Sequence, residues 1–290
     1  MESAEVLRAS EAARNTAAAL GLQVSDAIVV HNSDRIALRL QPCDVLVRIA
    51  PASWRQGMEF EALVARRLAE IGSPVGELDP RVELDVYECD GFAMTFWTYY
   101  ESVSDRRAQQ HLGMTTSLGP ADYAKALAQL HADLRQMDLT APHVMDRVAG
   151  WQLQVEDPER TPELRDRDRE LLRETLKSMS AAIRSEDSVE QLLHGEPHPG
   201  NVLDTRKGPL WIDVGTLQRG PVEYDLAYAP EEVTEFYPEP NQRLVQNFRI
   251  LMWAGIATMR WNQHDQYPRR DYWRVESLNQ FRTALESSAG

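Results

Sequence analysis

Hydrophobic and polar side chains alternate in short runs through the first third of the chain. Ile36–Leu40 and Val45–Ile49 carry apolar residues at every second position, and Val82–Val86 repeats the pattern. A period of two predicts half-buried antiparallel strands. Asp90-Gly91 is typical of a hairpin turn, and we expect it to join the last of these strands to Phe92–Phe96.

One stretch within this region has helical spacing instead. Between Trp54 and Ile71 the apolar residues recur every three or four positions, and Gly72 followed by Ser73-Pro74 supplies a stop. The expected order up to residue 98 is therefore strand, strand, strand, helix, strand, strand.

Beyond residue 98 the pattern becomes helical. Pro120 can begin a helix with an apolar stripe, a charged helix is predicted from Thr161-Pro162, and Leu244–Trp261 is apolar enough for a core helix. We predict two lobes, residues 1–98 and 99–290, with a boundary near Trp97 to Ser104.

A hairpin interrupts the helical region. Val202-Leu203 and Leu210–Ile212 are strand-like runs, and Arg206–Pro209 between them contains turn residues. The hairpin is predicted to lie within the second lobe.

Composition narrows the class of protein. The chain has 290 residues, of which 43% are hydrophobic and 26% charged, as in ordinary globular proteins. Its longest nearly apolar run, Ile250–Met259, is too short to cross a bilayer, and we expect no membrane association.

The net charge of −14 argues against binding to nucleic acid. Without a secretory segment, and with Cys43 and Cys89 far apart, we expect a cytoplasmic protein with reduced thiols. No protein partner is implied.

Candidate chemistry is concentrated between His194 and Gly215. The prolines and glycines of HGEPHPGN exclude a helix, so Glu196 and Asn201 should lie on a rigid loop before the hairpin. The hairpin should bring Asp213 back beside Asn201. Two carboxylates and a carboxamide form an all-oxygen set, which suits Mg²⁺ rather than zinc.

These segments resemble a known signature. HGEPHPGNVL, WIDVG and GPVEYDLA are similar to the phosphotransferase motifs of the aminoglycoside phosphotransferase and choline kinase superfamily. The resemblance implies an α+β, bilobal protein-kinase-like fold, with a small antiparallel-sheet N-lobe carrying one helix and a larger, mainly helical C-lobe. It also implies an Mg²⁺-dependent enzyme that moves the γ-phosphoryl group of ATP or GTP to a hydroxyl of a small molecule. An antibiotic such as an aminoglycoside, an amino alcohol, a sugar or a hydroxy amino acid would each be a suitable acceptor.

The resemblance also implies roles around the transferred phosphoryl group. Glu196 takes the place of the family's catalytic Asp and would orient the acceptor hydroxyl, while Asn201 and Asp213 would hold Mg²⁺. His194 and Asp225 are expected to brace the catalytic loop rather than to transfer protons.

For the nucleotide, the resemblance implies a second set of residues. Arg48 stands where the family usually has a phosphate-binding Lys, and Glu61 matches the acid that pairs with it. Phe96, Trp97 and Thr98 resemble the hinge, whose backbone would contact the base.

Two departures from the family's pattern, at positions 196 and 48, leave an alternative open. Glu196 is one methylene longer than Asp, and Arg48 replaces a point charge with a planar fork. No glycine occurs between Gly21 and Gly57, so the turn at 31–34 cannot be a glycine-rich flap. The alternative is a nucleotide-binding pseudokinase, a ligand-responsive module without transfer activity. Only nine residues separate Gly215 from Asp225, too few for a peptide-docking activation segment, so the acceptor should be a small molecule.

Overall fold

The computed structural model describes residues 3–33, 35–103 and 116–287, so the predicted boundary residue Ser104 and the turn residue Asp34 lie outside the described residues. Contacts divide the chain into a first unit, Met1–Ser117 with Asn201–Thr216, and a second unit, Leu118–Gly200 with Leu217–Gly290. The hairpin therefore groups with the first unit. The functional division into lobes 1–98 and 99–290 stays a prediction.

The first unit is built on a five-stranded antiparallel sheet with the strand order β1-β2-β3-β5-β4. The strands are β1 (Val24–Asn32), β2 (Ile36–Pro42), β3 (Val45–Pro51), β4 (Tyr87–Cys89) and β5 (Phe92–Thr98). The predicted alternation is confirmed in β2 and β3, where every second side chain is fully buried.

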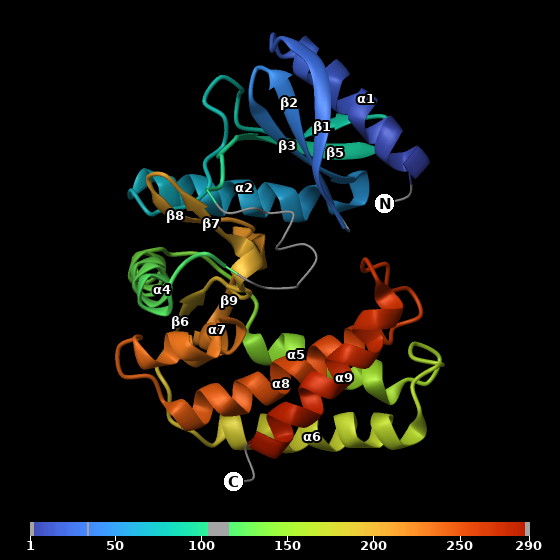
Figure 1. Ribbon diagram of the computed structural model, residues 1–290, viewed down its shortest axis with the longest axis vertical. Coiled ribbons are helices and arrows are strands. Elements are labelled where there is room, and N and C mark those ends of the chain that lie inside the picture. Colours follow the sequence, from blue (N-terminus) through green and yellow to red (C-terminus); the bar gives the residue numbers. More distant parts are fainter. Residues whose placement is uncertain (1–2, 34, 104–115, 288–290) are drawn as a thin grey trace. The chain divides into compact units, whose positions relative to one another are not determined.

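Two helices cover this sheet, one on each face (Figure 1). α1 (Ser3–Ala19), which the sequence analysis did not predict, packs its alanines on the apolar residues of β2, β3 and β5. α2 (Arg55–Glu70) lies within the predicted helix and packs Met58 against Ala50 and Ala93 of the opposite face. This second face also carries the side chains of the candidate site.

The prediction of a strand at Val82–Val86 is wrong. The strand begins at Tyr87, because the preceding residues form a turn around the buried Asp79. Asp79 Oδ1 accepts a hydrogen bond from Arg81 N at 3.0 Å, and Val82 N donates to the Asp79 carbonyl at 3.2 Å. These local bonds use backbone groups that a strand would need for pairing.

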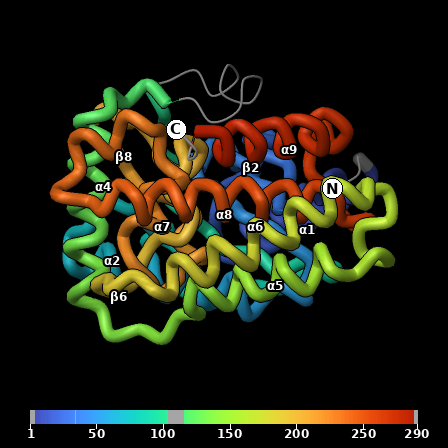
Figure 2. Tube along the Cα trace, turned by 90° about the horizontal axis from the view of Figure 1, so that it is seen from below, coloured from blue at the N-terminus to red at the C-terminus, as the bar shows by residue number. Residues whose placement is uncertain are grey.

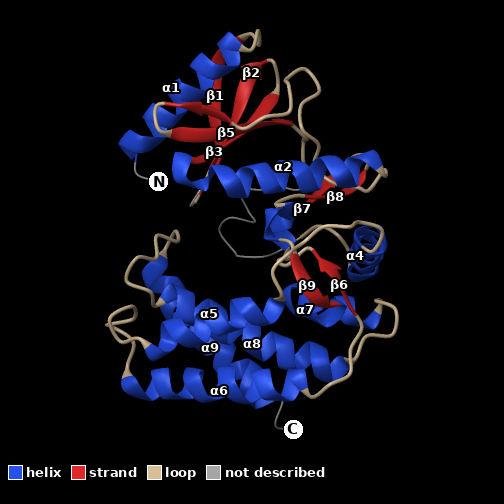
Figure 3. Cartoon of the chain, turned by 180° about the vertical axis from the view of Figure 1, so that it is seen from behind, coloured by secondary structure: helices blue, strands red, loops and turns tan. Residues whose placement is uncertain are grey.

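The predicted hairpin is confirmed as β7 (Val202–Thr205) and β8 (Gly208–Trp211), seen in red beneath α2 in Figure 3. Trp211 fixes it to the rest of the first unit. Its amide donates to the Pro74 carbonyl at 2.9 Å, and its carbonyl accepts from Gly76 N at 2.8 Å. The segment after α2 therefore holds the hairpin in place.

The second unit is mainly helical. Its helices are α4 (Pro120–Leu134), α5 (Val144–Glu156), α6 (Asp166–Arg184), α7 (Val222–Tyr228), α8 (Gln242–Arg260) and α9 (Arg270–Ser287). Helices α5, α6, α8 and α9 lie side by side around one apolar core (Figures 1 and 2). A two-stranded sheet of β6 (Glu190–Leu193) and β9 (Gln218–Pro221) flanks them. None of the described helices combines the length and apolar character that crossing a membrane requires.

The three helices predicted for this unit are all present, but one of them begins later than predicted. Pro120 begins α4, and α8 matches the predicted core helix. The helix predicted from Thr161 begins only at Asp166, because Thr161 is buried in a turn and its carbonyl accepts from Arg169 Nη2 at 2.7 Å. The predicted mixed fold, with a five-stranded antiparallel sheet and a larger, mainly helical part, is confirmed, but the sheet carries two helices where one was predicted.

Candidate functional site

Arg48 and Glu61, which the sequence analysis paired, form an ion pair in the first unit. Arg48 projects from β3 on the face that α2 covers, opposite Ala37 of β2 and Thr95 of β5 in the strand register. Glu61 reaches it from α2, and its side chain is only 2% exposed. A carboxylate so far from water requires a cationic partner, which the arginine supplies.

Asp213 joins the same cluster from the end of the hairpin. Its Oδ1 accepts a hydrogen bond from Arg48 Nη2 at 2.9 Å. Asp213 has a left-handed backbone with φ of 63°, a conformation that Asp adopts more readily than most residues with a side chain. This turn directs the chain from β8 into a short 3₁₀ helix, Val214–Thr216.

Gly215 explains the glycine of the WIDVG motif. A Cβ atom at this position would lie 3.0 Å from Glu61 Cβ, closer than ordinary van der Waals contact. Any larger residue would push the carboxylate of α2 away from Arg48. The close approach therefore depends on glycine.

A second arginine, Arg35, completes the cluster. It precedes β2 and donates to Glu61 Oε2 at 2.9 Å and to Asp213 Oδ1 at 2.6 Å. Two guanidinium groups thus face two carboxylates. Burial lowers the pKa of Arg48, but Glu61 and Asp213 raise it by more, so the guanidinium stays charged and its pKa lies above the ordinary value.

A cavity of about 100 Å³ opens beside these charges. Its walls come from the end of β1 and the turn after it, from β2 and β3, and from the end of the hairpin. The lining residues are His31, Ser33, Arg35, Ile36, Ala37, Arg48 and Asp213.

Asn201 and Asp213 form the predicted metal-binding pair. Asn201 is buried, and its carbonyl accepts from Ile212 N at 2.9 Å, which places it beside the strand end that carries Asp213. The amide and carboxylate oxygens are ligands that suit Mg²⁺, so the donor set fits the predicted ion. Among the described residues, no group of three His, Cys, Asp or Glu side chains is arranged to hold a metal.

The predicted hinge residues Phe96, Trp97 and Thr98 end β5. The Phe96 carbonyl accepts from Asp79 N at 3.0 Å, and Thr98 N donates to the Glu77 carbonyl at 2.9 Å. These two groups are therefore already used within the first unit. Base contact by the three residues stays a prediction.

The loop that carries Glu196, in the second unit, is fixed by the buried carboxylate of Asp225. Asp225 accepts from the backbone amides of His194 at 2.8 Å and Gly195 at 2.9 Å. His131 Nε2 lies 2.8 Å from the same carboxylate, and its Nδ1 lies 2.7 Å from the Tyr237 hydroxyl. The expectation that Asp225 braces this loop is confirmed, and His131 packs beside it as a buried hydrogen-bonding residue.

Two further contacts hold the loop. Glu196 N donates to His194 Nδ1 at 3.3 Å, which confirms the bracing role expected of this histidine. The hydroxyl of Tyr123, on α4, donates to the Pro197 carbonyl. The backbone on both sides of the Glu196 side chain is thus restrained.

Glu196 itself pairs with an arginine of the second unit. Its Oε1 accepts from Arg147 Nη1, on α5, at 2.7 Å. The same nitrogen lies 3.4 Å from the Tyr224 hydroxyl. Burial raises the pKa values of Tyr224 and Tyr228, so both phenols are neutral near pH 7 and act as hydrogen-bonding groups rather than bases.

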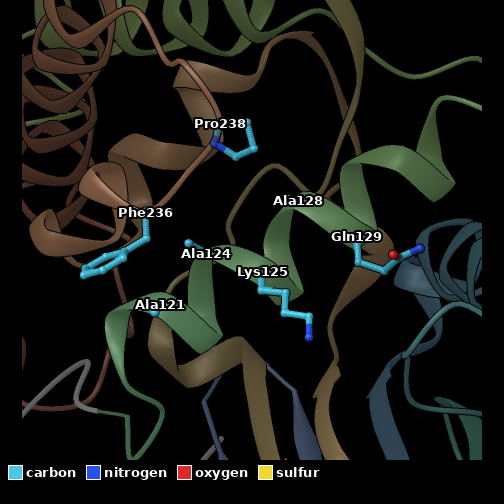
Figure 4. Close-up of a pocket in the computed structure, with 7 residues that line it drawn as sticks. All are labelled: Ala121, Ala124, Lys125, Ala128, Gln129, Phe236 and Pro238. Carbon is cyan, nitrogen blue, oxygen red and sulfur yellow. The ribbon is translucent and has the colours of Figure 1, made fainter.

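A larger cavity of about 470 Å³ lies elsewhere in the second unit (Figure 4). α4 forms one wall, and Phe236 and Pro238 form the other. The wall from α4 consists of Ala121, Ala124, Lys125, Ala128 and Gln129. No predicted site residue lines this cavity, and it offers no carboxylate for a metal or a hydroxyl acceptor.

Sequence reasoning missed Arg35 and Arg147. Arg35 lies two residues before Ala37, which pairs with Arg48, so the period of two puts Arg35 on the same face of the sheet as Arg48. This alternation in the sequence could have identified Arg35. Arg147 lies on a helix that was not predicted, and no local pattern indicated that it meets Glu196.

Comparison with known proteins gives a match over most of the chain. Residues 29–261 match the model of the phosphotransferase enzyme family. No curated protein matches the sequence.

Several solved structures share the fold. A choline/ethanolamine kinase family protein from Mesorhizobium loti is 16% identical, with a TM-score of 0.65, over 94% of this chain and 95% of that one. The amicoumacin kinase solved with AMP-PNP and Ca²⁺ is 10% identical, with a TM-score of 0.66, over 97% and 96% of the two chains. The spectinomycin phosphotransferase solved with ADP and spectinomycin is 13% identical, with a TM-score of 0.60, over 93% of each chain.

Proposed function

The chain belongs to the phosphotransferase enzyme family, and we propose that it transfers the γ-phosphoryl group of ATP or GTP to a hydroxyl group of a small molecule, with Mg²⁺ as cofactor. The predicted superfamily and its protein-kinase-like fold class are confirmed. The observation that carries the proposal is the convergence of Arg48, Glu61 and Asp213 in the first unit. β3, α2 and the WIDVG segment, which supply these residues, are far apart in the sequence, so the fold itself brings them together.

Arg48 is proposed to bind the nucleotide phosphates. A guanidinium forms two parallel hydrogen bonds to phosphate oxygens, and Glu61 fixes the direction of this side chain. The base is proposed to meet the backbone of Phe96, Trp97 and Thr98, at the end of β5.

Asn201 and Asp213 are proposed to hold Mg²⁺. The ion, when bound, neutralises charge on the phosphate oxygens. The chain's own contribution is the hairpin, which fixes the two oxygen-bearing side chains at adjoining strand ends.

Glu196 is proposed to orient the acceptor hydroxyl and to take its proton as the phosphoryl group moves. Arg147 holds the carboxylate through the contact at 2.7 Å, which restrains a side chain longer than the family's usual Asp. The rigid loop and this ion pair together set the direction of the carboxylate. Positioning of this kind provides much of the rate in phosphoryl transfer.

The test is acceptor-dependent consumption of ATP and GTP in the presence of Mg²⁺. The panel comprises aminoglycosides, other hydroxylated antibiotics, amino alcohols, sugars and hydroxy amino acids, which are the acceptor classes that the family suggests. We expect one class to accelerate nucleotide consumption in the parent protein and not in Asp213→Ala. Nucleotide binding without turnover on any acceptor would favour the pseudokinase alternative and overturn the proposal.

A further inference from the structure

Arg35 and Arg48 make the same pair of contacts. Each guanidinium joins Glu61 to Asp213, with Nη1 on Glu61 and Nη2 on Asp213. The four side chains form a closed ring in which two positive and two negative charges balance. Arg35 therefore duplicates the role that the family pattern gives to Arg48 alone.

The strand register explains how two arginines reach one place. Ala37 pairs with Arg48 across β2 and β3, and Arg35 lies two residues before Ala37, so all three side chains point to the same face. Ala37 is small and lines the cavity between the two longer side chains. The space above Ala37 is thus open to a ligand that contacts both guanidinium groups.

The chemistry of the cavity favours an anion with several oxygens. Guanidinium groups bind phosphate through paired, charge-assisted hydrogen bonds, and two of them suit a polyphosphate better than a single anion. The turn before β2 has no glycine in the sequence that would let backbone amides approach phosphate closely. Arg35, which follows this turn, instead brings a guanidinium group to the wall of the cavity.

We propose that Arg35 is a second phosphate-binding residue and that, in the nucleotide-free protein, Arg35 and Arg48 together hold Asp213. When the phosphates bind, both guanidinium groups turn to them and Asp213 Oδ1 is released. Nucleotide binding thereby makes Asp213 Oδ1 available to bind Mg²⁺. This inference rests on the proposed function, because it takes the ligand to be a nucleoside triphosphate.

Opposite effects on two ligands distinguish this role from a merely structural one. Removing the Arg35 charge removes a phosphate contact, which weakens the binding of ATP or GTP. It also removes from Asp213 one of the two guanidinium groups that contact it among the described residues, which strengthens the binding of Mg²⁺ alone. A variant that simply loosened the fold would weaken both.

The experiment compares Arg35→Gln with Arg66→Gln by isothermal titration calorimetry. Arg66 is a half-exposed arginine of α2 that pairs with Glu70 at 3.7 Å, so its substitution removes the same charge away from the cavity. ATP and GTP are titrated in EDTA, adenosine and guanosine serve as phosphate-free ligands, and Mg²⁺ is titrated alone. Thermal unfolding verifies that both variants are folded.

We expect Arg35→Gln to weaken metal-free triphosphate binding by about 10- to 100-fold, the effect of one charged hydrogen-bonding group. Nucleoside affinity should be unchanged, Mg²⁺ alone should bind more tightly, and Arg66→Gln should match the parent. Arg35→Lys should recover part of the triphosphate affinity, because it restores the charge without the planar fork.

Equal triphosphate affinity in Arg35→Gln and Arg66→Gln would overturn the inference and leave the proposed function standing. Equal Mg²⁺ affinity in the parent and Arg35→Gln would overturn the release of Asp213. Parent protein that binds triphosphate with Mg²⁺ but not in EDTA would also refute the two-arginine site. If the parent binds no triphosphate under either condition, the proposed function fails together with the inference.

Discussion

Substitution of Glu61 by Gln tests whether the charged cluster stabilises the first unit. The carboxylate is 2% exposed and receives one hydrogen bond from Arg35 and one from Arg48. Gln keeps one acceptor oxygen, so one charged hydrogen bond is lost, at about 1.5–3 kcal/mol. The amide nitrogen of Gln would then face a guanidinium group. Removing one partner of a fully buried ion pair costs about 3–5 kcal/mol, which is the upper limit here. Because the arginines are 21% and 16% exposed and remain partly hydrated, we expect a loss of about 2–4 kcal/mol.

The matched control is Glu59→Gln on the same helix. Glu59 pairs with Arg55 at 2.7 Å, but both side chains are well exposed, so the control should leave the free energy of unfolding close to that of the parent. Thermal unfolding measured by fluorescence should show Glu61→Gln melting roughly 4–16 °C below the parent, at about 2–4 °C per kcal/mol. If the two variants melt at the same temperature, Glu61 does not hold the cluster together and the reasoning about its burial is refuted.

Three predictions concern the proposed reaction. Asp213→Ala should abolish phosphoryl transfer while the circular dichroism spectrum stays near that of the parent, and normal turnover would exclude Asp213 as a metal ligand. Arg48→Ala should weaken nucleotide affinity measured by calorimetry, whereas Arg48→Lys should retain much of it; unchanged affinity in Arg48→Ala would remove Arg48 from the phosphate site. Glu196→Gln should retain nucleotide binding but lower turnover by roughly 100- to 10,000-fold. Glu196→Asp should also lose activity, about 100-fold, because the shorter side chain no longer reaches Arg147. Full activity in Glu196→Gln would contradict the catalytic role of Glu196.

Local patterns in the sequence were sufficient for much of the fold. The period of two in β2 and β3 and the helical stripe of α2 are set by burial on one side, and both appear in the structure as predicted. α1 was missed because its buried face consists mostly of alanines, which give a weak apolar stripe. Val82–Val86 alternates like a strand, but the hydrogen bonds of Asp79 impose a turn there.

The candidate site depended on sequence motifs, and its partners depended on tertiary structure. Asp213 and Asn201 could be placed together because a hairpin joins them. The contact of Arg147 with Glu196 could not be predicted, since the two residues are 49 positions apart in the sequence and no local pattern connects them. Arg35 was an intermediate case, because its sheet face follows from the strand period but its carboxylate partners do not.

The most direct test of the account is detection of the phosphorylated product. Parent protein is incubated with ATP or GTP, Mg²⁺ and the acceptor that most accelerates nucleotide consumption, and ³¹P NMR follows the γ-phosphoryl group. We expect a phosphomonoester signal on the acceptor that grows in step with the nucleoside diphosphate, and no such signal with Asp213→Ala. Release of inorganic phosphate alone, or an unchanged triphosphate with every acceptor despite measurable nucleotide binding, would contradict it.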